Sequence, residues 1–187
     1  PKYVRVICAI PRRELHPSGK GILITKIAVH RQKKSKFFAL AQSELGDVYK
    51  ISVLIDPVDK SKVIGIDVAH FDTLPVANAL NIHKQGMLFI SAEFGDHSLY
   101  QFERIDVENP LKCTSDEGKD AFLRQSTCTD VSFFNTENAA AIAPRFTPTV
   151  LQNLRKITYM DSAAPITGVL VGELAGNEVS PQIYTLN

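Results

Sequence analysis

The feature that most constrains this chain is a series of short β-strand segments joined by tight polar turns. The first four segments are rich in β-branched residues or alternate between apolar and polar side chains, which is typical of strands: Gly21–Arg31, Lys36–Glu44, Asp47–Ile55 and Lys62–Phe71. Their connections are as short as those of β-hairpins. Four strands joined in sequence by such turns predict an antiparallel meander.

The same pattern then starts again. Val76–His83, Met87–Glu93 and Ser98–Ile105 are the next predicted strands. The turn sequence Glu44-Leu45-Gly46-Asp47 recurs as Glu93-Phe94-Gly95-Asp96, 49 residues later. Glycine suits both turns because it tolerates a positive φ. A repeat of about 40–50 residues with four strands is typical of a β-propeller blade, whose sheet must bury both of its faces between neighbours.

The second half of the chain is less regular. We expect a surface loop over the polar segment Asp106–Gly118 and an irregular segment over Asn135–Pro148. Ser126–Phe134 is a candidate strand that would complete the second meander. Thr149–Lys156 predicts a short helix.

The predicted fold class is all-β, a partial β-propeller of four-stranded antiparallel blades. Ile166–Leu174 and Gln182–Leu186 predict paired strands that open a third unit. Propellers close with about four to eight blades, and these segments are too few to close a ring. We therefore expect a fragment of a larger multi-propeller protein. Alone, such a piece would expose sheet edges and blade faces and would self-associate through them.

No residue pattern predicts a catalytic, cofactor-binding or metal site. The cysteines Cys8, Cys113 and Cys128 are odd in number and form no C-x-x-C pair, which argues against a disulfide framework or a zinc site and favours a reducing compartment. The usual nucleotide-loop, hydrolase and metalloprotease motifs are absent. His70 and Asp72 would share one face of a strand, and a satisfied polar pair is favoured there over an acid–base pair. No apolar stretch approaches the roughly 18 residues of a membrane helix.

Charge is distributed unevenly along the chain. Residues 1–36 carry ten lysines and arginines against one acidic residue, a net charge of +9, whereas residues 37–187 carry −8. Basic segments can hold nucleic-acid phosphates. The candidate nucleic-acid-binding residues are therefore Arg12, Arg13, Lys33, Lys34 and Lys36. The basic run Arg31–Lys36 has no interleaved aromatic residues to stack bases, so a solvated hairpin tip is the favoured interpretation.

Several long strings carry a family resemblance. They are PRR, KSKFFALAQSELGDVYKI, FDTLPVANAL and GMLFISAEFGDHSLYQFERI within Ile7–Ile105, and DSAAPITGVLVGELAG within Asn153–Leu186. Together they resemble the splicing factor 3b subunit 3 family, the large propeller subunits of the U2 small nuclear ribonucleoprotein. That family is similar in plan to damage-specific DNA-binding protein 1 and to the large subunit of the cleavage and polyadenylation specificity factor.

The resemblance implies a nuclear, non-catalytic scaffold without a cofactor. Its expected partners are other splicing factor 3b subunits and U2 particle proteins, during branch-site recognition in pre-mRNA splicing. It also implies that residues 1–105 hold the last blades of a first propeller. Residues 106–152 would form a variable loop and connecting segment, and residues 153–187 a linker and the first strands of the following propeller section. An RNA-contacting segment, an adaptor of the damage-specific DNA-binding protein 1 type and, least favoured, an enzyme are the alternatives.

Overall fold

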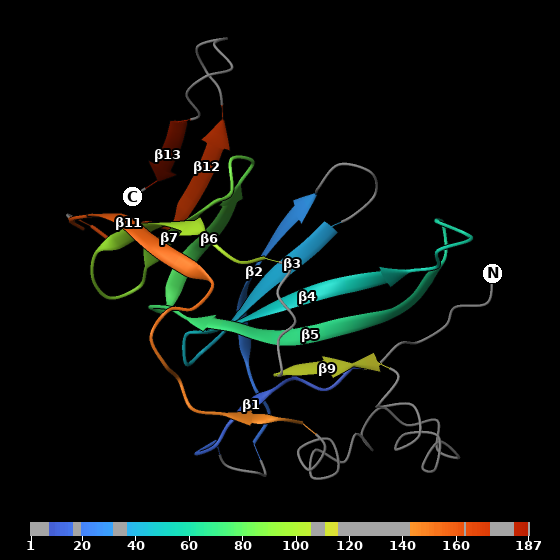
Figure 1. Cartoon of the computed structure of the whole chain (residues 1–187). Helices are drawn as coiled ribbons and strands as arrows, with labels where there is room; N and C mark the ends of the chain where they lie inside the picture. The colour runs from blue at the N-terminus through green and yellow to red at the C-terminus, as the bar shows by residue number, and fades with distance from the viewer. Residues whose placement is uncertain are drawn as a thin grey trace.

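The first sheet contains the predicted first meander. The computed structural model describes residues 8–16, 20–31, 37–105, 111–115, 143–162, 164–172 and 182–186 (Figure 1). The first sheet has the strand order β2-β3-β4-β5-β9, and all neighbouring strands are antiparallel. Its strands are β2 (Ile24–Arg31), β3 (Phe37–Ser43), β4 (Asp47–Ile55), β5 (Val63–Thr73) and β9 (Lys112–Thr114). The first four are the strands of the predicted meander, which is confirmed.

The second sheet repeats this arrangement with an outer strand from later in the chain. Its order is β11-β8-β7-β6, and again all neighbours are antiparallel. The strands are β6 (Ala77–His83), β7 (Met87–Ala92), β8 (His97–Phe102) and β11 (Leu154–Met160). The second sheet has four strands, and the first sheet has the four strands of the meander with β9 added at its edge. Both are antiparallel, as the blades of a propeller are.

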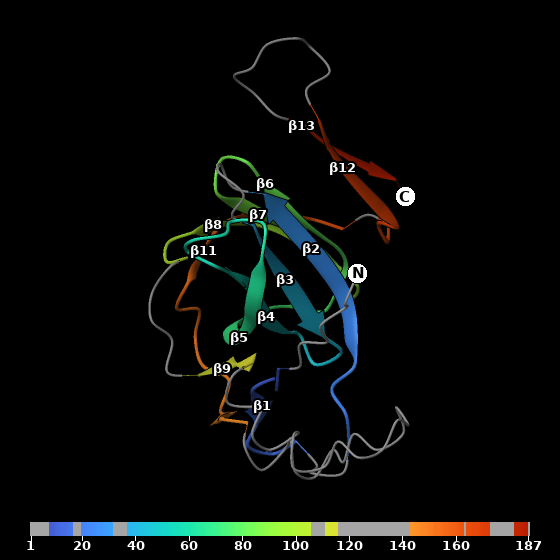
Figure 2. The same ribbon diagram turned by 90° about the vertical axis from the view of Figure 1, so that its right-hand side faces the viewer.

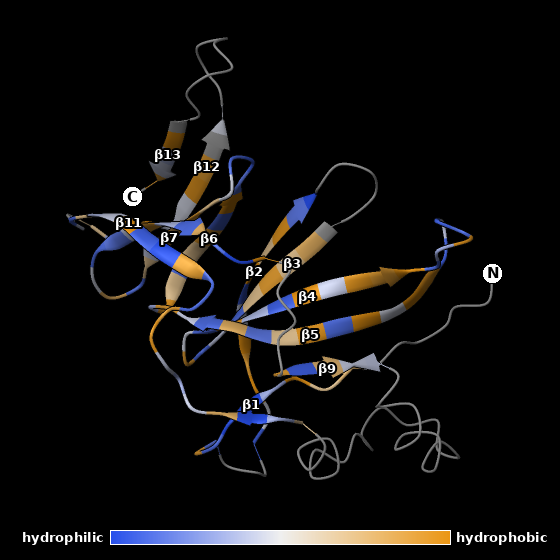
Figure 3. Cartoon of the chain, in the orientation of Figure 1, coloured by the Kyte–Doolittle hydropathy of each residue, from blue (hydrophilic) through white to orange (hydrophobic). Residues whose placement is uncertain are grey.

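The main hydrophobic core lies between the two sheets, which lie side by side in both views (Figures 1 and 2). It joins residues of the first sheet, among them Phe38 and Leu40, to residues of the second, among them Leu88 and Ile90. Figure 3 shows changes between apolar and polar residues along β4 and β5. Because successive residues of a strand point to opposite faces of the sheet, the two faces carry different sets of side chains. Burying a leucine or isoleucine contributes about 1.5–3 kcal/mol, so this interface is the main source of cohesion between the blades.

A second, smaller core covers the opposite face of the first sheet. Tyr49, Val68 and Phe146 are its buried members. Phe146 comes from β10 (Arg145–Phe146), which pairs in parallel with β1 (Arg12–Arg13). The N-terminal segment and a segment far along the chain therefore lie together beside the first sheet.

The repeated glycine turns follow the sequence prediction, and a buried glutamine holds the link between the sheets. Gly46 and Gly95 both have positive φ, 83° and 117°. The string Phe71–Ala77 carries the chain from β5 to β6, and the fully buried amide of Gln42 holds this link. Gln42 Nε2 donates to the Pro75 carbonyl at 2.8 Å, and its Oε1 accepts the Ala77 N–H at 2.9 Å.

A two-stranded antiparallel ladder ends the described chain. β12 (Gly168–Gly172) pairs with β13 (Gln182–Leu186), which confirms the predicted strand pair. In both views this ladder lies at the opposite end of the molecule from β1 (Figures 1 and 2). Among the described residues, no helix has the length and apolar content that crossing a membrane requires.

Three predictions for the second half need correction. The helix predicted over Thr149–Lys156 is wrong, because Leu154–Met160 forms β11 on the open edge of β8. The predicted surface loop Asp106–Gly118 contains β9, and the predicted irregular segment Asn135–Pro148 contains β10. The candidate strand Ser126–Phe134 lies outside the described residues. Each of the three new strands is short and has a weak preference for β-structure. Each forms by pairing with the edge of a strand far away in the sequence, so the local sequence does not predict it.

Candidate functional site

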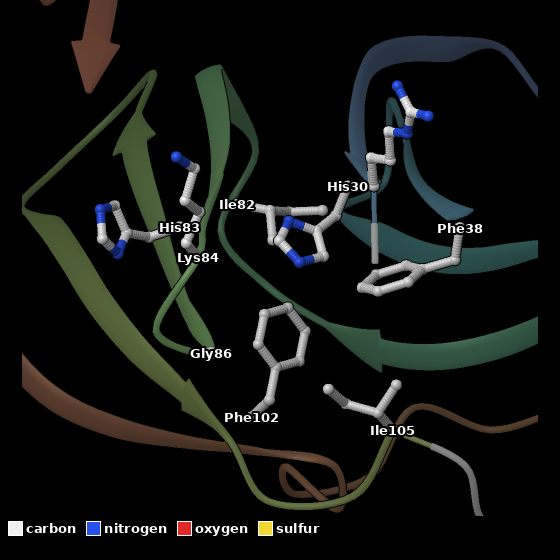
Figure 4. A pocket seen from close by; sticks show the side chains of 9 residues that line it. His30, Phe38, Ile82, His83, Lys84, Gly86, Phe102 and Ile105 are labelled. Carbon is white, nitrogen blue, oxygen red and sulfur yellow. The ribbon is translucent and has the colours of Figure 1, made fainter. Parts of the chain in front are cut away.

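A groove of about 500 Å³ opens at one end of the inter-sheet core (Figure 4). One side comes from the ends of β2 and β3, and the other from the β6–β7 hairpin and the end of β8. The lining residues are His30, Arg31, Phe38, Ile82, His83, Lys84, Gly86, Phe102 and Ile105. Three of these side chains, Ile82, Phe102 and Ile105, are partly buried and pack against the main core. The groove is thus the open end of the interface between the two blades.

An irregularity in β2 directs His30 into this groove. Ile24 pairs with Ser43 and Lys26 with Gln42, so one residue of β2 is left without a partner between them. Such a bulge reverses the alternation of side chains that follows it. Ala28 consequently lies in the core between the sheets, and His30, two residues further on, lies opposite Phe38 on β3.

Aromatic and aliphatic side chains form the floor of the groove. The Phe38 and Phe102 rings pack edge to face, with centroids 6.2 Å apart and planes at 83°. The ring of His30 lies 5.6 Å from that of Phe38. Lys50 Nζ lies 5.7 Å from the centroid of the Phe38 ring and donates to the carbonyl of Ile105. The floor is therefore apolar, and a cation is already seated against one of its rings.

The rim of the groove is basic. Arg31 and Lys84 are exposed at the two hairpins that border it. Figure 4 shows Ile82 directed toward His30 and Phe38, whereas His83, the next residue of β6, points away from them. His83 Nδ1 instead accepts the backbone N–H of Gln85 at 3.3 Å. Among the described residues that line the groove, none is acidic, so this lining favours an anionic partner with an apolar portion.

The structure brings the two arginines among the candidate nucleic-acid residues into contacts within the fold. Arg12 is buried and donates from Nη1 to the Lys20 carbonyl at 2.9 Å. Arg13 binds Asp47 through both carboxylate oxygens, at 2.7 and 2.8 Å, and also donates to the Leu45 carbonyl. The other three candidates, Lys33, Lys34 and Lys36, lie outside the described residues. The nucleic-acid role of the five residues stays a prediction.

The Arg13–Asp47 pair is a structural anchor. The Asp47 side chain is 2% exposed, and its Oδ1 also accepts the Thr73 hydroxyl at 2.8 Å. The hydrogen bond that Arg13 donates to Asp47 raises the pKa of Arg13, against the smaller opposing effect of burial. A bidentate arginine–carboxylate pair has the geometry that best repays the burial of two charges. It ties β1 to the turn between β3 and β4.

His70 and Asp72 do not share a face, contrary to the sequence prediction. Tyr49 pairs with His70 and Val48 with Asp72, so Phe71 is a bulge between them. Asp72 accepts the backbone N–H groups of Gln152 at 2.8 Å and Asn153 at 3.0 Å. The acid–base interpretation is therefore excluded, and each group has a separate structural contact.

The environment of His70 is that of a packed core side chain. Its ring stacks on Phe146 at 3.9 Å and lies edge to face with Tyr49. Burial lowers the pKa of His70 to about 4, so the ring is neutral at physiological pH. Among the described residues, no three histidine, cysteine, aspartate or glutamate side chains gather closely enough to hold a metal ion.

The sequence alone does not show that the groove residues lie together, although it contains a charge pattern that points to them. The basic run that begins at Arg31 and the pair His83-Lys84 both follow strands of the two meanders. If the meanders stack as blades, the hairpins that carry them lie side by side. The missing information was the bulge in β2, which places His30 on the groove side.

Comparison with known proteins gives consistent matches along the chain. The family model for the RSE1/DDB1/CPSF1 first β-propeller matches residues 2–157. Probable splicing factor 3B subunit 3 of Dictyostelium discoideum is 35% identical over 185 residues, which is 98% of this chain and 13% of that protein. Spliceosome-associated protein 130 A of Arabidopsis thaliana is 34% identical over 181 residues, 97% of this chain and 13% of that protein.

A vertebrate protein matches equally well. Splicing factor 3B subunit 3 of Danio rerio is 36% identical over 184 residues, which is 95% of this chain and 13% of that protein. The chain thus spans about 13% of the length of the curated relatives it matches.

Proposed function

The chain belongs to the RSE1/DDB1/CPSF1 first β-propeller family, and from this we propose that it is a section of a non-catalytic propeller scaffold for pre-mRNA splicing. The observation that carries the proposal is similarity over nearly the whole chain to proteins named splicing factor 3B subunit 3. Two adjacent antiparallel sheets, one of five strands and one of four, support it, because a scaffold of this kind works through rigid stacked blades.

The finer proposal concerns the assembly. We propose that the protein acts in the nucleus within the splicing factor 3b complex of the U2 small nuclear ribonucleoprotein, and supports branch-site recognition. Its partners would be other subunits of that complex. Residues 1–105 would contribute the last blades of a first propeller, and residues 106–152 a variable connecting segment. Residues 153–187 would lead into the next propeller section, although β11 within them pairs with the second sheet.

Co-purification of the full-length protein tests this assignment. A tagged full-length protein should recover splicing factor 3b subunits and U2 RNA from nuclear extract. Leu88→Asp puts a charge into the core between the blades, where Leu88 is fully buried, and should abolish recovery by breaking blade packing. Lys60→Ala, at an exposed turn, is the matched control and should leave it unchanged. Recovery of a cullin ligase instead would favour the adaptor alternative.

A second proposed function is direct RNA contact. The net charge of +9 on residues 1–36 favours it. The RNA association constant K should fall less steeply with salt when Lys33, Lys34 and Lys36 are replaced with alanine. The magnitude of the slope of log K against log salt concentration should decrease by about two, since each single-strand phosphate contact contributes about 0.7. Lys60→Ala with Lys62→Ala is the control pair. Salt-independent binding, or binding that survives alanine at Arg12, Arg13 and the three lysines, would remove this function.

A further inference from the structure

We propose that the groove between the two blades binds a short acidic segment of a partner protein, anchored by one large apolar side chain. The groove is the one described above, between the β2–β3 and β6–β7 hairpins, with Arg31 and Lys84 on its rim. The inference rests on the groove itself and does not depend on the splicing assignment.

The floor of the groove calls for an apolar anchor. Ile82, Phe102 and Ile105 are each only partly buried, and each packs against the closed core beneath. An inserted phenylalanine or leucine side chain would extend that core outward and remove the remaining apolar surface from water. The volume of about 500 Å³ falls within the range of about 300–1,000 Å³ that is usual for ligand sites. A single side chain with its flanking backbone fits such a space.

The rim calls for carboxylates beside that anchor. Arg31 stands on one hairpin and Lys84 on the other, and both are exposed. The part of the lining that the structure describes contains no acidic residue. The arginine fork suits bidentate binding of a carboxylate, and the lysine supplies a mobile point charge. Because the two cations lie on opposite sides of the apolar floor, the matching segment has acidic residues on both sides of its anchor.

The aromatic floor does not suit stacked bases, which separates this partner from RNA. Base stacking needs an exposed ring face. Phe38 is 4% exposed, Lys50 Nζ lies over its ring, and Phe102 meets it edge to face at 83°. The two rings therefore offer no parallel platform, whereas an aliphatic or aromatic side chain can pack against them in any orientation.

Fluorescence anisotropy with the full-length protein tests the proposal, and the probes are labelled peptides. The first peptide has one phenylalanine between two pairs of acidic residues. The second replaces the phenylalanine with alanine, and the third replaces the acids with their amides. The first should bind, and the second should bind at least about tenfold more weakly, because a buried anchor carries most of the affinity. The third should also bind more weakly and lose its salt dependence.

Charge reversal locates the binding. Arg31→Glu with Lys84→Glu should weaken binding of the first peptide about tenfold. Lys60→Glu with Lys62→Glu makes the same change in net charge at the β4–β5 turn and should leave the affinity unchanged. All four substituted positions are exposed, and an unchanged melting temperature verifies that the variants fold.

Three results would overturn the proposal. The first is no measurable binding of the acidic phenylalanine peptide to folded protein. The second is equal binding of the alanine peptide, or equal loss of affinity in the two charge-reversed pairs. The third is a single-stranded RNA oligonucleotide that binds the groove, loses affinity with Arg31→Glu and Lys84→Glu, and is not displaced by the peptide. That last outcome would assign the groove to RNA instead.

Discussion

Asp47 and Asp72 show how single buried carboxylates join segments that are distant in the chain. Asp47 holds the side chain of Arg13, 34 positions away, and Asp72 holds the backbone of Gln152, 80 positions away. Asp47 belongs to the repeated turn motif that the sequence makes conspicuous. Its partner cannot be predicted, because Arg13 is one of ten basic residues among the first 36 and nothing in the sequence distinguishes it from the others. Long-range pairing is a property of the fold, not of local sequence.

The first prediction concerns this arginine. Arg13→Met keeps an apolar side chain of similar length but leaves the buried Asp47 carboxylate without its main partner. The free energy of unfolding, measured by urea denaturation, should therefore fall by about 2–3 kcal/mol. Arg155→Met is the matched control, because Arg155 pairs with Glu103 where both side chains are largely exposed, and the loss there should be below about 1 kcal/mol. Equal losses would contradict the anchoring role of Arg13.

The second prediction compares two glycines at the same position of the repeat. Both have positive φ, but a Cβ on Gly46 would lie 2.2 Å from the Leu74 carbonyl oxygen, whereas a Cβ on Gly95 would meet nothing within 4 Å. Gly95→Ala should destabilise the protein by about 1 kcal/mol from backbone strain alone. Gly46→Ala should cost clearly more, about 3 kcal/mol, because backbone must move. Thermal or urea unfolding measures both, and a smaller loss at Gly46 would refute the close approach.

At the scale of elements, the sequence predicted most of the two sheets and failed where pairing is non-local. The strands from β2 to β8 are located correctly because most of them alternate or are rich in β-branched residues, and short turns join them within each sheet. β11 was predicted in part as a helix, and six of its seven residues are exposed, so it lacks the alternation that identifies a half-buried strand. Its position is determined by the free edge of β8 and by the carboxylate of Asp72.

The third prediction concerns the anchor of β11. Burial raises the pKa of Asp72, and the hydrogen bonds from the backbone of Gln152, Asn153 and Leu154 lower it by less. A folded pKa above the unfolded one means that the folded state binds more protons between the two values. The contribution of Asp72 to stability is therefore fully present below the unfolded pKa. It is lost as pH rises through the folded pKa.

Urea denaturation of the wild type and of Asp72→Asn, at a series of pH values from about 3.5 to 7, measures this effect. The difference in free energy of unfolding should move in favour of the variant as pH rises. Asn keeps one acceptor for the backbone of residues 152–153 and does not ionise, so it isolates the titration. A difference that is flat with pH, or that moves in favour of wild type, would contradict the raised pKa.

At the scale of the molecule, the two packed sheets leave apolar faces outside. Ala28 faces the inter-sheet core, so Ile27 and Val29 on either side of it face away, and they are 62% and 64% exposed. The blade repeat predicts such a face, because each blade of a propeller buries two faces between its neighbours. The sequence could not place the groove, since it arises only where the two sheets meet.

The fourth prediction concerns this outer face of β2. Ile27→Thr with Val29→Thr keeps β-branched residues in the strand but removes apolar surface. In sedimentation equilibrium of the isolated chain, self-association should weaken roughly tenfold. Val58→Thr changes a valine that is even more exposed, at a turn away from this face, and should have no effect. A monomeric wild-type chain, or equal weakening by the control, would contradict association through this face.

The late arrival of β11 in the second sheet has a consequence for biosynthesis. β8 ends at Phe102 and β11 begins at Leu154, so the ribosome must add residues 103–153 before that edge can be closed. At about 5–20 residues per second, this takes roughly 3–10 s. During that interval the nascent chain presents an unpaired strand to chaperones and to neighbouring chains on the polysome. Slow translation of this stretch would therefore prolong the time for which the edge of β8 stays open.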